Sequence, residues 1–251
     1  FPPESVMAWF EAHDVPLKTK EDLRVFPVSD NGKDIVAVFE RLFNTPPSHV
    51  RVLLSTSIAH ITKQNNIFTI VCKDDATITA DRCIITTGGQ AYRHTGSTGD
   101  GYAFAESLGH TITPLAPSLS SFTTRETWPK GLSGLSLPYA RLSAPEHPHA
   151  VYDGPFLFTH RGVSGPAVFA LSGLVAFTEA SVAHPIKLAI ACFPDETIVA
   201  LEQRLTQLCR EQSRKSMRTI LGFVLPKALA EVLITELQIN GDAQAAQAAK
   251  E

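Results

Sequence analysis

Hydrophobic and polar positions divide the chain into helical and extended stretches. Apolar residues recur at helical spacing in residues 34–43, where Ile35, Val38, Phe39 and Leu42 predict an amphipathic helix. A shorter helix is expected near the start, with Val6, Trp9 and Phe10 on one face. β-Branched runs predict strands at 50–54, 57–61, 67–72, 77–80 and 82–86, with a hairpin turn at Asp74-Asp75.

The second half of the chain has a different pattern. Six prolines between Pro114 and Pro148 separate short apolar runs, which favours strands over long helices. Strands are expected at 140–142, 155–158 and 185–193, with a loop at 162–166 and a helix from 167 to 174. Three apolar stripes beyond Asp195 predict three helices, the first capped by Asp195. Overall this is an α/β (α+β) chain with a β-rich unit, residues 117 to about 193, followed by helices to 251.

The buried strand expected at 82–86 runs directly into Thr87, Gly88 and Gly89. Glycine permits a sharp turn and close approach by a ligand. A polar glycine loop then leads to a helix predicted from Tyr102 to Leu108, which Thr98 or Asp100 could cap and Gly109 could end. Strand, glycine turn and helix start are typical of nucleotide and anion sites. A tight turn without a ligand is the competing interpretation, and the spacing of Gly96, Gly99 and Gly101 is not that of the dinucleotide fingerprint.

Several ordered motifs together resemble the HI0933/YhiN-like flavoproteins, which include aminoacetone oxidase-like and BaiN-like enzymes. The motifs lie at residues 24–29, 86–89, 95–102, 107–110, 157–160 and 162–167. The resemblance implies a Rossmann-like FAD-binding domain, here residues 1–116, interrupted by an inserted domain, here residues 117–251. It also implies an FAD-dependent oxidoreductase that transfers a hydride between a small organic substrate and flavin, with NAD(P)H as a possible electron donor.

The same resemblance points to the residues beside FAD. These are Thr87, Gly88 and Gly89, then Gly96, Ser97, Thr98, Gly99 and Asp100 of the loop, and Ile58, for which a core position is the alternative. His160 is the candidate for proton transfer, although a structural histidine explains it as well. Neither the amino-terminal G-x-G-x-x-G nor the carboxyl-terminal glycine segment of such enzymes is present. The chain is therefore expected to be an internal fragment that is inactive alone and binds FAD weakly or not at all, whereas the intact enzyme is expected to be active.

Other compositional features limit the alternatives. A net charge of -3 argues against a general nucleic-acid surface or an acidic membrane as partner. The four widely spaced cysteines form no disulfide framework or zinc pattern, which fits free thiols in a reducing cytoplasm. No metal site is expected, and Ser164 misses the spacing of a nucleophile elbow. The remaining alternative is a non-catalytic nucleotide-binding or interaction module. The sequence leaves the substrate and the oligomeric state open.

Overall fold

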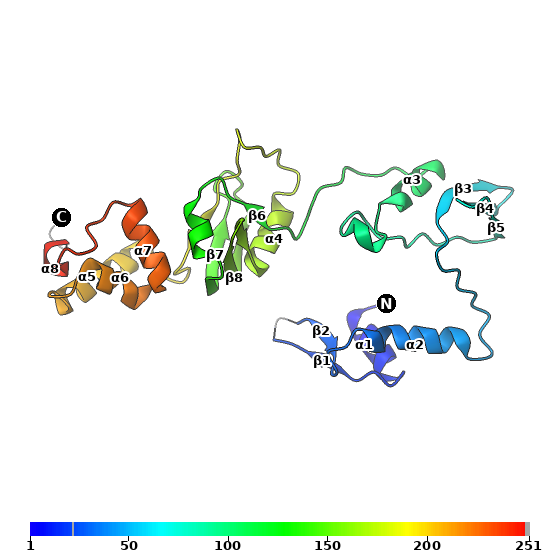
Figure 1. Ribbon diagram of the computed structural model, residues 1–251, viewed down its shortest axis with the longest axis horizontal. Coiled ribbons are helices and arrows are strands. Elements are labelled where there is room, and N and C mark those ends of the chain that lie inside the picture. Colours follow the sequence, from blue (N-terminus) through cyan, green and yellow to red (C-terminus); the bar gives the residue numbers. More distant parts are fainter. Residues whose placement is uncertain (22, 249–251) are drawn as a thin grey trace. The chain divides into compact units, whose positions relative to one another are not determined.

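The computed structural model describes residues 1–21 and 23–248, which form a mixed α/β protein (Figure 1). The chain divides into two compact units, Phe1–Thr113 and Pro114–Glu251. The predicted helical tail ends in residues 249–251, which lie outside the described residues. Among the described residues, no helix has the length and apolar character needed to cross a bilayer.

The first unit begins with two helices that pack through aromatic rings. Helix α1 spans Pro3–Glu11 and α2 spans Lys33–Asn44, as their apolar spacing predicted. Trp9 of α1 stacks on Phe39 of α2 with ring centroids 5.5 Å apart, and Val38 is buried. Between the helices, β1 (Leu17–Thr19) and β2 (Val25–Pro27) form a small antiparallel ribbon.

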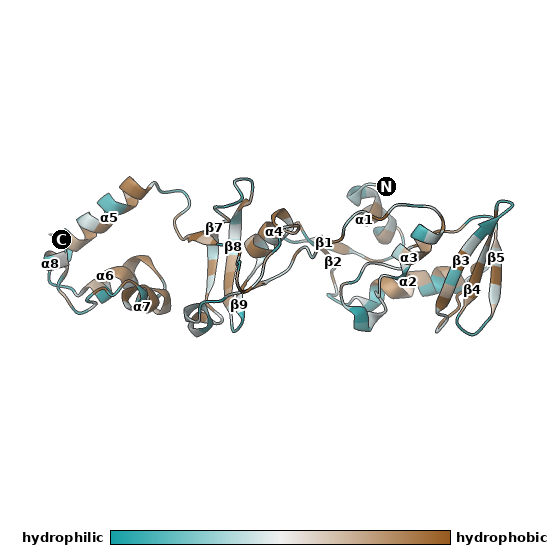
Figure 2. Ribbon diagram, turned by 90° about the horizontal axis from the view of Figure 1, so that it is seen from above, coloured by the Kyte–Doolittle hydropathy of each residue, from teal (hydrophilic) through white to brown (hydrophobic). Residues whose placement is uncertain are grey.

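A three-stranded antiparallel sheet forms the rest of this unit. Strands β3 (Ile58–Gln64), β4 (Ile67–Cys72) and β5 (Thr77–Ala80) pair in sequence order, and the predicted hairpin turn is confirmed. Helix α3 (Asp100–Ser107) packs against β3. Phe104 of α3, Ile61 of β3 and Cys72 of β4 are all buried. In Figure 2 the apolar colour dominates β4, the central strand.

Two strand predictions in this unit are wrong. Residues 50–54 and 82–86 pair with no other strand, and the run 82–86 is not buried as expected. Leu54 is 83% exposed and Ile84 is 85% exposed. The apolar, β-branched pattern of these segments suits a strand covered on both faces. A strand also needs a neighbour for its backbone hydrogen bonds, and the described residues provide none here.

The second unit is built on a five-stranded antiparallel sheet with the order β10-β7-β8-β9-β6. The strands are β6 (Phe122–Thr123), β7 (Ser136–Ser143), β8 (Val151–Thr159), β9 (Gly162–Ser164) and β10 (Ala189–Ala191). The predicted loop at 162–166 is therefore wrong in its first half, which is strand β9. The predicted strand 185–193 is reduced to the three residues of β10, which pair with β7.

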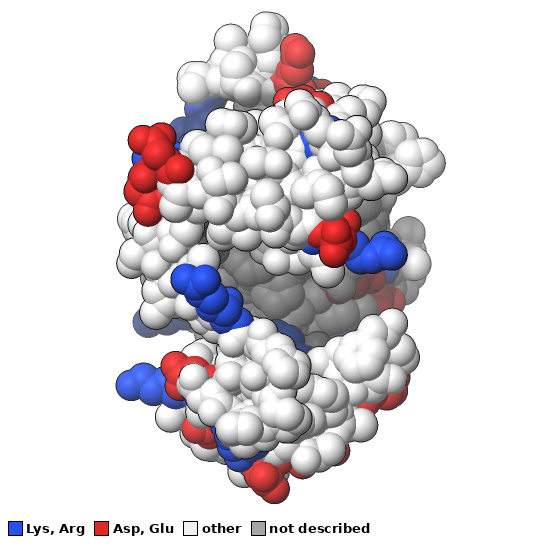
Figure 3. All heavy atoms as spheres, turned by 90° about the vertical axis from the view of Figure 1, so that its right-hand side faces the viewer, with Lys and Arg blue, Asp and Glu red and all other residues white. Residues whose placement is uncertain are grey.

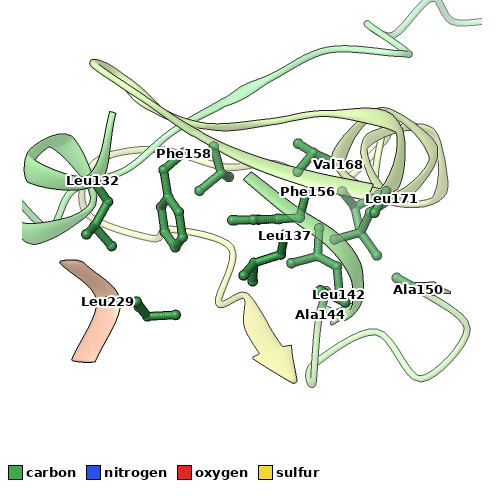
Figure 4. Close-up of a cluster of buried hydrophobic side chains, with 14 residues drawn as sticks. Leu132, Leu137, Leu142, Ala144, Ala150, Phe156, Phe158, Val168, Leu171 and Leu229 are labelled. Carbon is green, nitrogen blue, oxygen red and sulfur yellow. The ribbon is translucent and has the colours of Figure 1, made fainter. Parts of the chain in front are cut away.

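The main core lies between this sheet and helix α4 (Pro166–Leu174) (Figure 4). Phe156 and Phe158 of β8 pack edge to face with ring centroids 4.8 Å apart. Val168 and Leu171 of α4 are completely buried against the strands. Burial of each such side chain stabilises the fold by about 1.5–3 kcal/mol. Among the described residues, a second and smaller cluster of Cys209, Ile220 and Ala245 also lies in this unit.

The chain ends in a group of helices. These are α5 (Ile198–Glu211), α6 (Met217–Val224), α7 (Lys227–Glu236) and α8 (Ala245–Ala248). Leu229 joins α7 to the core of the sheet beside η2 (Trp128–Leu132). The predicted cap of α5 is wrong, because Thr197, not Asp195, accepts the hydrogen bond from the Ala200 amide. Thr197 is the residue directly before the helix, and from this position a side-chain oxygen can accept a hydrogen bond from the amide of the third helical residue.

Candidate functional site

An apolar cavity of about 300 Å³ lies in the first unit, beside the sheet β3–β5. Its floor comes from strand and helix side chains, among them Ile58, Ile61, Ile70 and Phe104. The rest of the lining comes from the two unpaired apolar segments and the residues just after them, namely Arg51, Leu53, Thr56, Cys83, Ile84, Ile85 and Thr87. Two predicted site residues, Ile58 and Thr87, are thus brought to one cavity from positions 29 residues apart in sequence.

The two glycine segments predicted to flank the cofactor pack against each other. A Cβ atom on Gly101 would lie 2.5 Å from Thr87 Oγ1, and one on Gly88 would lie 3.1 Å from Ser97 Oγ. A Cβ atom on Gly99 would meet the Gln90 side chain at 2.7 Å. Gly88, Gly96 and Gly99 also have positive φ angles, which L-residues rarely adopt. Glycine at these positions therefore allows the loop 96–101 to fold back onto the turn 87–90.

Helix α3 begins where this loop ends. Its N-cap is Gly99 in a left-handed conformation, and no side chain caps it. The predicted capping by Thr98 or Asp100 is wrong, because the Thr98 hydroxyl donates instead to the Asp100 carboxylate at 2.6 Å. The predicted C-terminal role of Gly109 is confirmed by its φ of +92° and by the amides of Gly109 and His110, which donate to carbonyls of the last helical turn.

The backbone beside the cavity has free hydrogen-bonding capacity. No amide N–H of residues 83–91 donates a hydrogen bond to another described residue. Thr87 and Gly88 are exposed and Gly89 is half-buried, so the turn is open to solvent. Unpaired amides at a glycine turn are suited to phosphate oxygens. Together with the apolar wall, the arrangement fits a ligand that has a flat apolar part and an anionic part.

Two cavity residues were not among the sequence-based candidates. Arg51 is exposed and has no ion-pair partner among the described residues, so its guanidinium adds the cation that an anionic ligand requires. Cys83 is a free, half-buried thiol on the same wall. The sequence does contain one indication of Arg51 as a site residue, because it is a charged residue within the apolar run 50–54. In Figure 3 the charges of both signs are scattered over the face shown, without a continuous patch of one sign.

The remaining candidates lie in the second unit. His160 is exposed on the turn between β8 and β9, so it is not a buried structural histidine. The Ser164 hydroxyl accepts a hydrogen bond from the Ser121 hydroxyl at 2.8 Å, with no histidine in contact. The described residues contain no group of three or more side chains able to hold a metal ion. Among the predicted site residues, Ile58 and Thr87 line a cavity together, so the cavity of the first unit is the candidate ligand site.

Comparison with known proteins gives the chain its family. The sequence profile of the HI0933-like protein barrel and H2TH domain matches residues 116–251, more than half of the chain. The chain belongs to the HI0933-like family. The resemblance read from its motifs is confirmed, and this HI0933-like chain has the mixed α/β fold expected from its sequence.

Curated relatives extend the comparison. The chain is 34% identical over 155 residues to a ribosomal RNA dihydrouridine synthase of Haemophilus influenzae, covering 61% of this chain and 35% of the relative. It is 28% identical over 188 residues to the protein of that name in Escherichia coli, covering 74% and 44%. A 3-dehydro-bile acid delta(4,6)-reductase of Clostridium scindens is 26% identical over 154 residues, covering 61% and 37%. The HI0933-like chain thus spans less than half the length of each relative.

Proposed function

We propose that this chain is part of an FAD-dependent oxidoreductase that reduces an activated carbon–carbon double bond. The proposal depends on the cavity of the first unit and the open glycine turn beside it. Two unpaired, apolar, β-type segments border a cavity and one of them ends in an open glycine turn. In Rossmann-like folds a dinucleotide lies at the carboxyl ends of strands, with its pyrophosphate on such a turn.

The residues fit parts of FAD in distinct ways. Ile58, Ile85 and Phe104 supply the apolar wall for an aromatic ring, whereas the amides of Thr87 to Gly89 and the Arg51 guanidinium supply partners for phosphate. Ser97 and Thr98 carry hydroxyl groups on the adjoining loop. The positive φ angles of Gly96 and Gly99 and the hydrogen bond from Thr98 to Asp100 shape the backbone of this loop. When bound, FAD supplies the hydride chemistry, and the protein positions it.

The relatives support a particular class of reaction. One relative is named for making dihydrouridine in ribosomal RNA and another for reducing a delta(4,6) bile acid. Both products gain two hydrogens across a conjugated double bond, one as hydride and one as a proton on the other carbon. His160, exposed on the β8–β9 turn, is the candidate proton donor in this reaction. The substrate class of this protein is therefore an electron-poor alkene.

The test uses a polypeptide of the relatives' length that contains this chain. We expect it to purify with flavin absorbance, and we expect Gly88→Val and Gly101→Val to lower the flavin content several-fold, since each adds atoms at the turn. Gly222→Ala, at an open position on α6, is the matched control and should keep the flavin.

The second step of the test measures the reaction. The bound flavin is photoreduced without oxygen and mixed with a uridine-containing RNA or with a 3-keto steroid carrying 4,6 double bonds. Reoxidation by either compound supports a reductase, and His160→Gln should slow this step without lowering flavin content. A protein that binds flavin but is reoxidised by neither compound, or that never binds flavin, favours the alternative of a non-catalytic nucleotide-binding or interaction module.

A further inference from the structure

One edge of the second unit brings together exposed basic residues from separate segments of the chain. Strand β6 pairs with β9 so that Thr123 lies opposite Gly162, and the Thr124 amide donates to the Arg161 carbonyl at 3.2 Å. The next residue after Thr124 is Arg125. Continuing this register sets Arg125 opposite His160, so the backbones of Arg125 and Arg161 come together at the end of the β6–β9 pair, although they are 36 positions apart in sequence.

Gly162 makes this approach possible. A Cβ atom on Gly162 would lie 2.3 Å from the Phe122 carbonyl oxygen and 2.7 Å from the Thr124 amide nitrogen. Real Cβ atoms essentially never approach backbone this closely. The Thr159 hydroxyl further fixes the turn by accepting hydrogen bonds from the amides of Arg161 and Gly162. The position of Arg161 is thus set by backbone contacts, which leaves its side chain available.

The side chains on this edge have no structural charge partner. Arg125 and Arg161 are exposed and form no ion pair with any described residue. His160 is exposed beside them, and Lys130 lies on η2, which packs against β8 and β9. The neighbouring carboxylate in sequence is Glu126, which pairs with none of them. The edge therefore carries a local positive charge that the chain's net charge of -3 conceals.

Three other arginines of this unit form ion pairs. Arg141 forms a two-pronged pair with Asp153, Arg204 forms one with Glu196, and Arg218 contacts Glu231. These pairs link elements within the fold. Arg125 and Arg161 form no such pair with a described residue, and the β6–β9 pairing brings their two segments together, which leaves both guanidinium groups available to one external anion.

We propose that this edge binds the phosphate backbone of an RNA substrate. The planar guanidinium of arginine matches phosphate geometry with two parallel hydrogen bonds, and two adjacent arginines suit successive phosphates. The hydroxyls of Ser121 and Ser164, in contact on the same strand pair, add partners for sugar or phosphate oxygens. A steroid carries no repeating phosphate that would use this edge. The choice of RNA rests on the proposed function, in which one of the substrate classes is uridine in RNA.

The experiment measures binding of the 251-residue chain to a fluorescein-labelled single-stranded RNA by fluorescence polarisation over a range of salt concentrations. We expect Arg125→Gln/Arg161→Gln to weaken binding about tenfold and to reduce the salt slope by about 1.4, since each phosphate contact on a single strand contributes roughly 0.7. The matched control is Arg210→Gln/Arg214→Gln, which removes two exposed, unpaired arginines from another surface of the same unit.

The outcomes separate the inference from the proposed function. Loss of binding in the first variant but not in the control supports the edge as the RNA surface. Equal effects of the two variants, no effect of either, or no RNA binding by the unmodified chain at low salt would overturn it. This measurement needs no flavin, so absence of RNA binding would contradict the inference about this edge but not the reductase proposal. A protein that binds RNA through this edge but never binds flavin would contradict only the reductase proposal.

Discussion

At the scale of single residues, a missing side chain can set the distance between two strands. The backbone of β6 passes over Gly162 so closely that any Cβ atom there would overlap the Phe122 carbonyl. The φ angle of Gly162 is +153°, a value that favours glycine. A sequence shows the glycine but not the strand β6 that pairs beside it, so 162–166 was expected to be a loop.

Replacing Gly162 tests this packing. We expect Gly162→Ala to lower the free energy of unfolding of the second unit by roughly 2–3 kcal/mol, because the added methyl forces β6 and β9 apart. Urea denaturation followed by circular dichroism measures the change. Gly222→Ala is the control, since nothing lies within 4 Å of its added atom and alanine suits a helix interior. Equal stability of the two variants would contradict the packing described.

Charge pairing at Asp153 gives a second prediction at this scale. The hydrogen bond from Arg141 holds the pKa of the Asp153 carboxyl below its usual range. Its contribution to stability is thus present above the unfolded-state pKa of about 3.9 and is lost as pH falls through the lower folded value. We expect the stability difference between the unmodified protein and Asp153→Asn to be constant from about pH 5 to 8 and to shrink below about pH 4. Thermal melts across this range measure it, and a difference that grows in acid would contradict the pairing.

At the scale of elements, a segment with the residue pattern of a strand forms one only where a partner strand is available. Residues 82–86 have the composition of a buried strand but remain unpaired, and Ile84 is 85% exposed. Helix α2, in contrast, has the bounds that its apolar spacing predicted within one residue. A helix satisfies its backbone internally, whereas a strand depends on a neighbour that its own sequence does not specify.

The exposed segment leads to a prediction. In this chain we expect Ile84→Lys to change the free energy of unfolding by less than about 0.5 kcal/mol, as for other surface substitutions. In a polypeptide of the relatives' length, the same change should reduce flavin content, because it puts a charge into the apolar wall of the proposed flavin site. The control is Ile61→Lys, at 4% exposure, which should destabilise both forms. Strong destabilisation of this chain by Ile84→Lys would show that the segment is already packed.

At the scale of the whole molecule, the two units differ in the size of their cores. The second unit buries a continuous cluster between α4 and strands β7 and β8, including Phe156, Phe158 and Leu171. The first unit buries separate small groups, such as Val38 in the helices and Ile61 beside Phe104. Local stability follows the number of buried apolar contacts.

Hydrogen exchange should reveal this difference. We expect the amides of β7, β8 and α4 to exchange most slowly and those of β3 and β4 to exchange faster, because the smaller core opens more readily. Mass spectrometry of exchange in the native 251-residue chain gives both values in one experiment. Slower exchange in β3 and β4 than in β8 would show that the cavity-bearing unit is the more stable one.

The amino-acid sequence by itself determined the family, the mixed fold class, the longer helices, the hairpin at Asp74-Asp75, and the glycine positions of the candidate site. Those features follow from local periodicity and from backbone freedom at single residues. Only the tertiary structure decided which β-type segments found partners, that Ile58, Thr87 and Arg51 line one cavity, and that the segment before Arg125 pairs with the segment that follows Arg161. These features depend on contacts between residues far apart in the chain, and local pattern does not encode which distant segments come together.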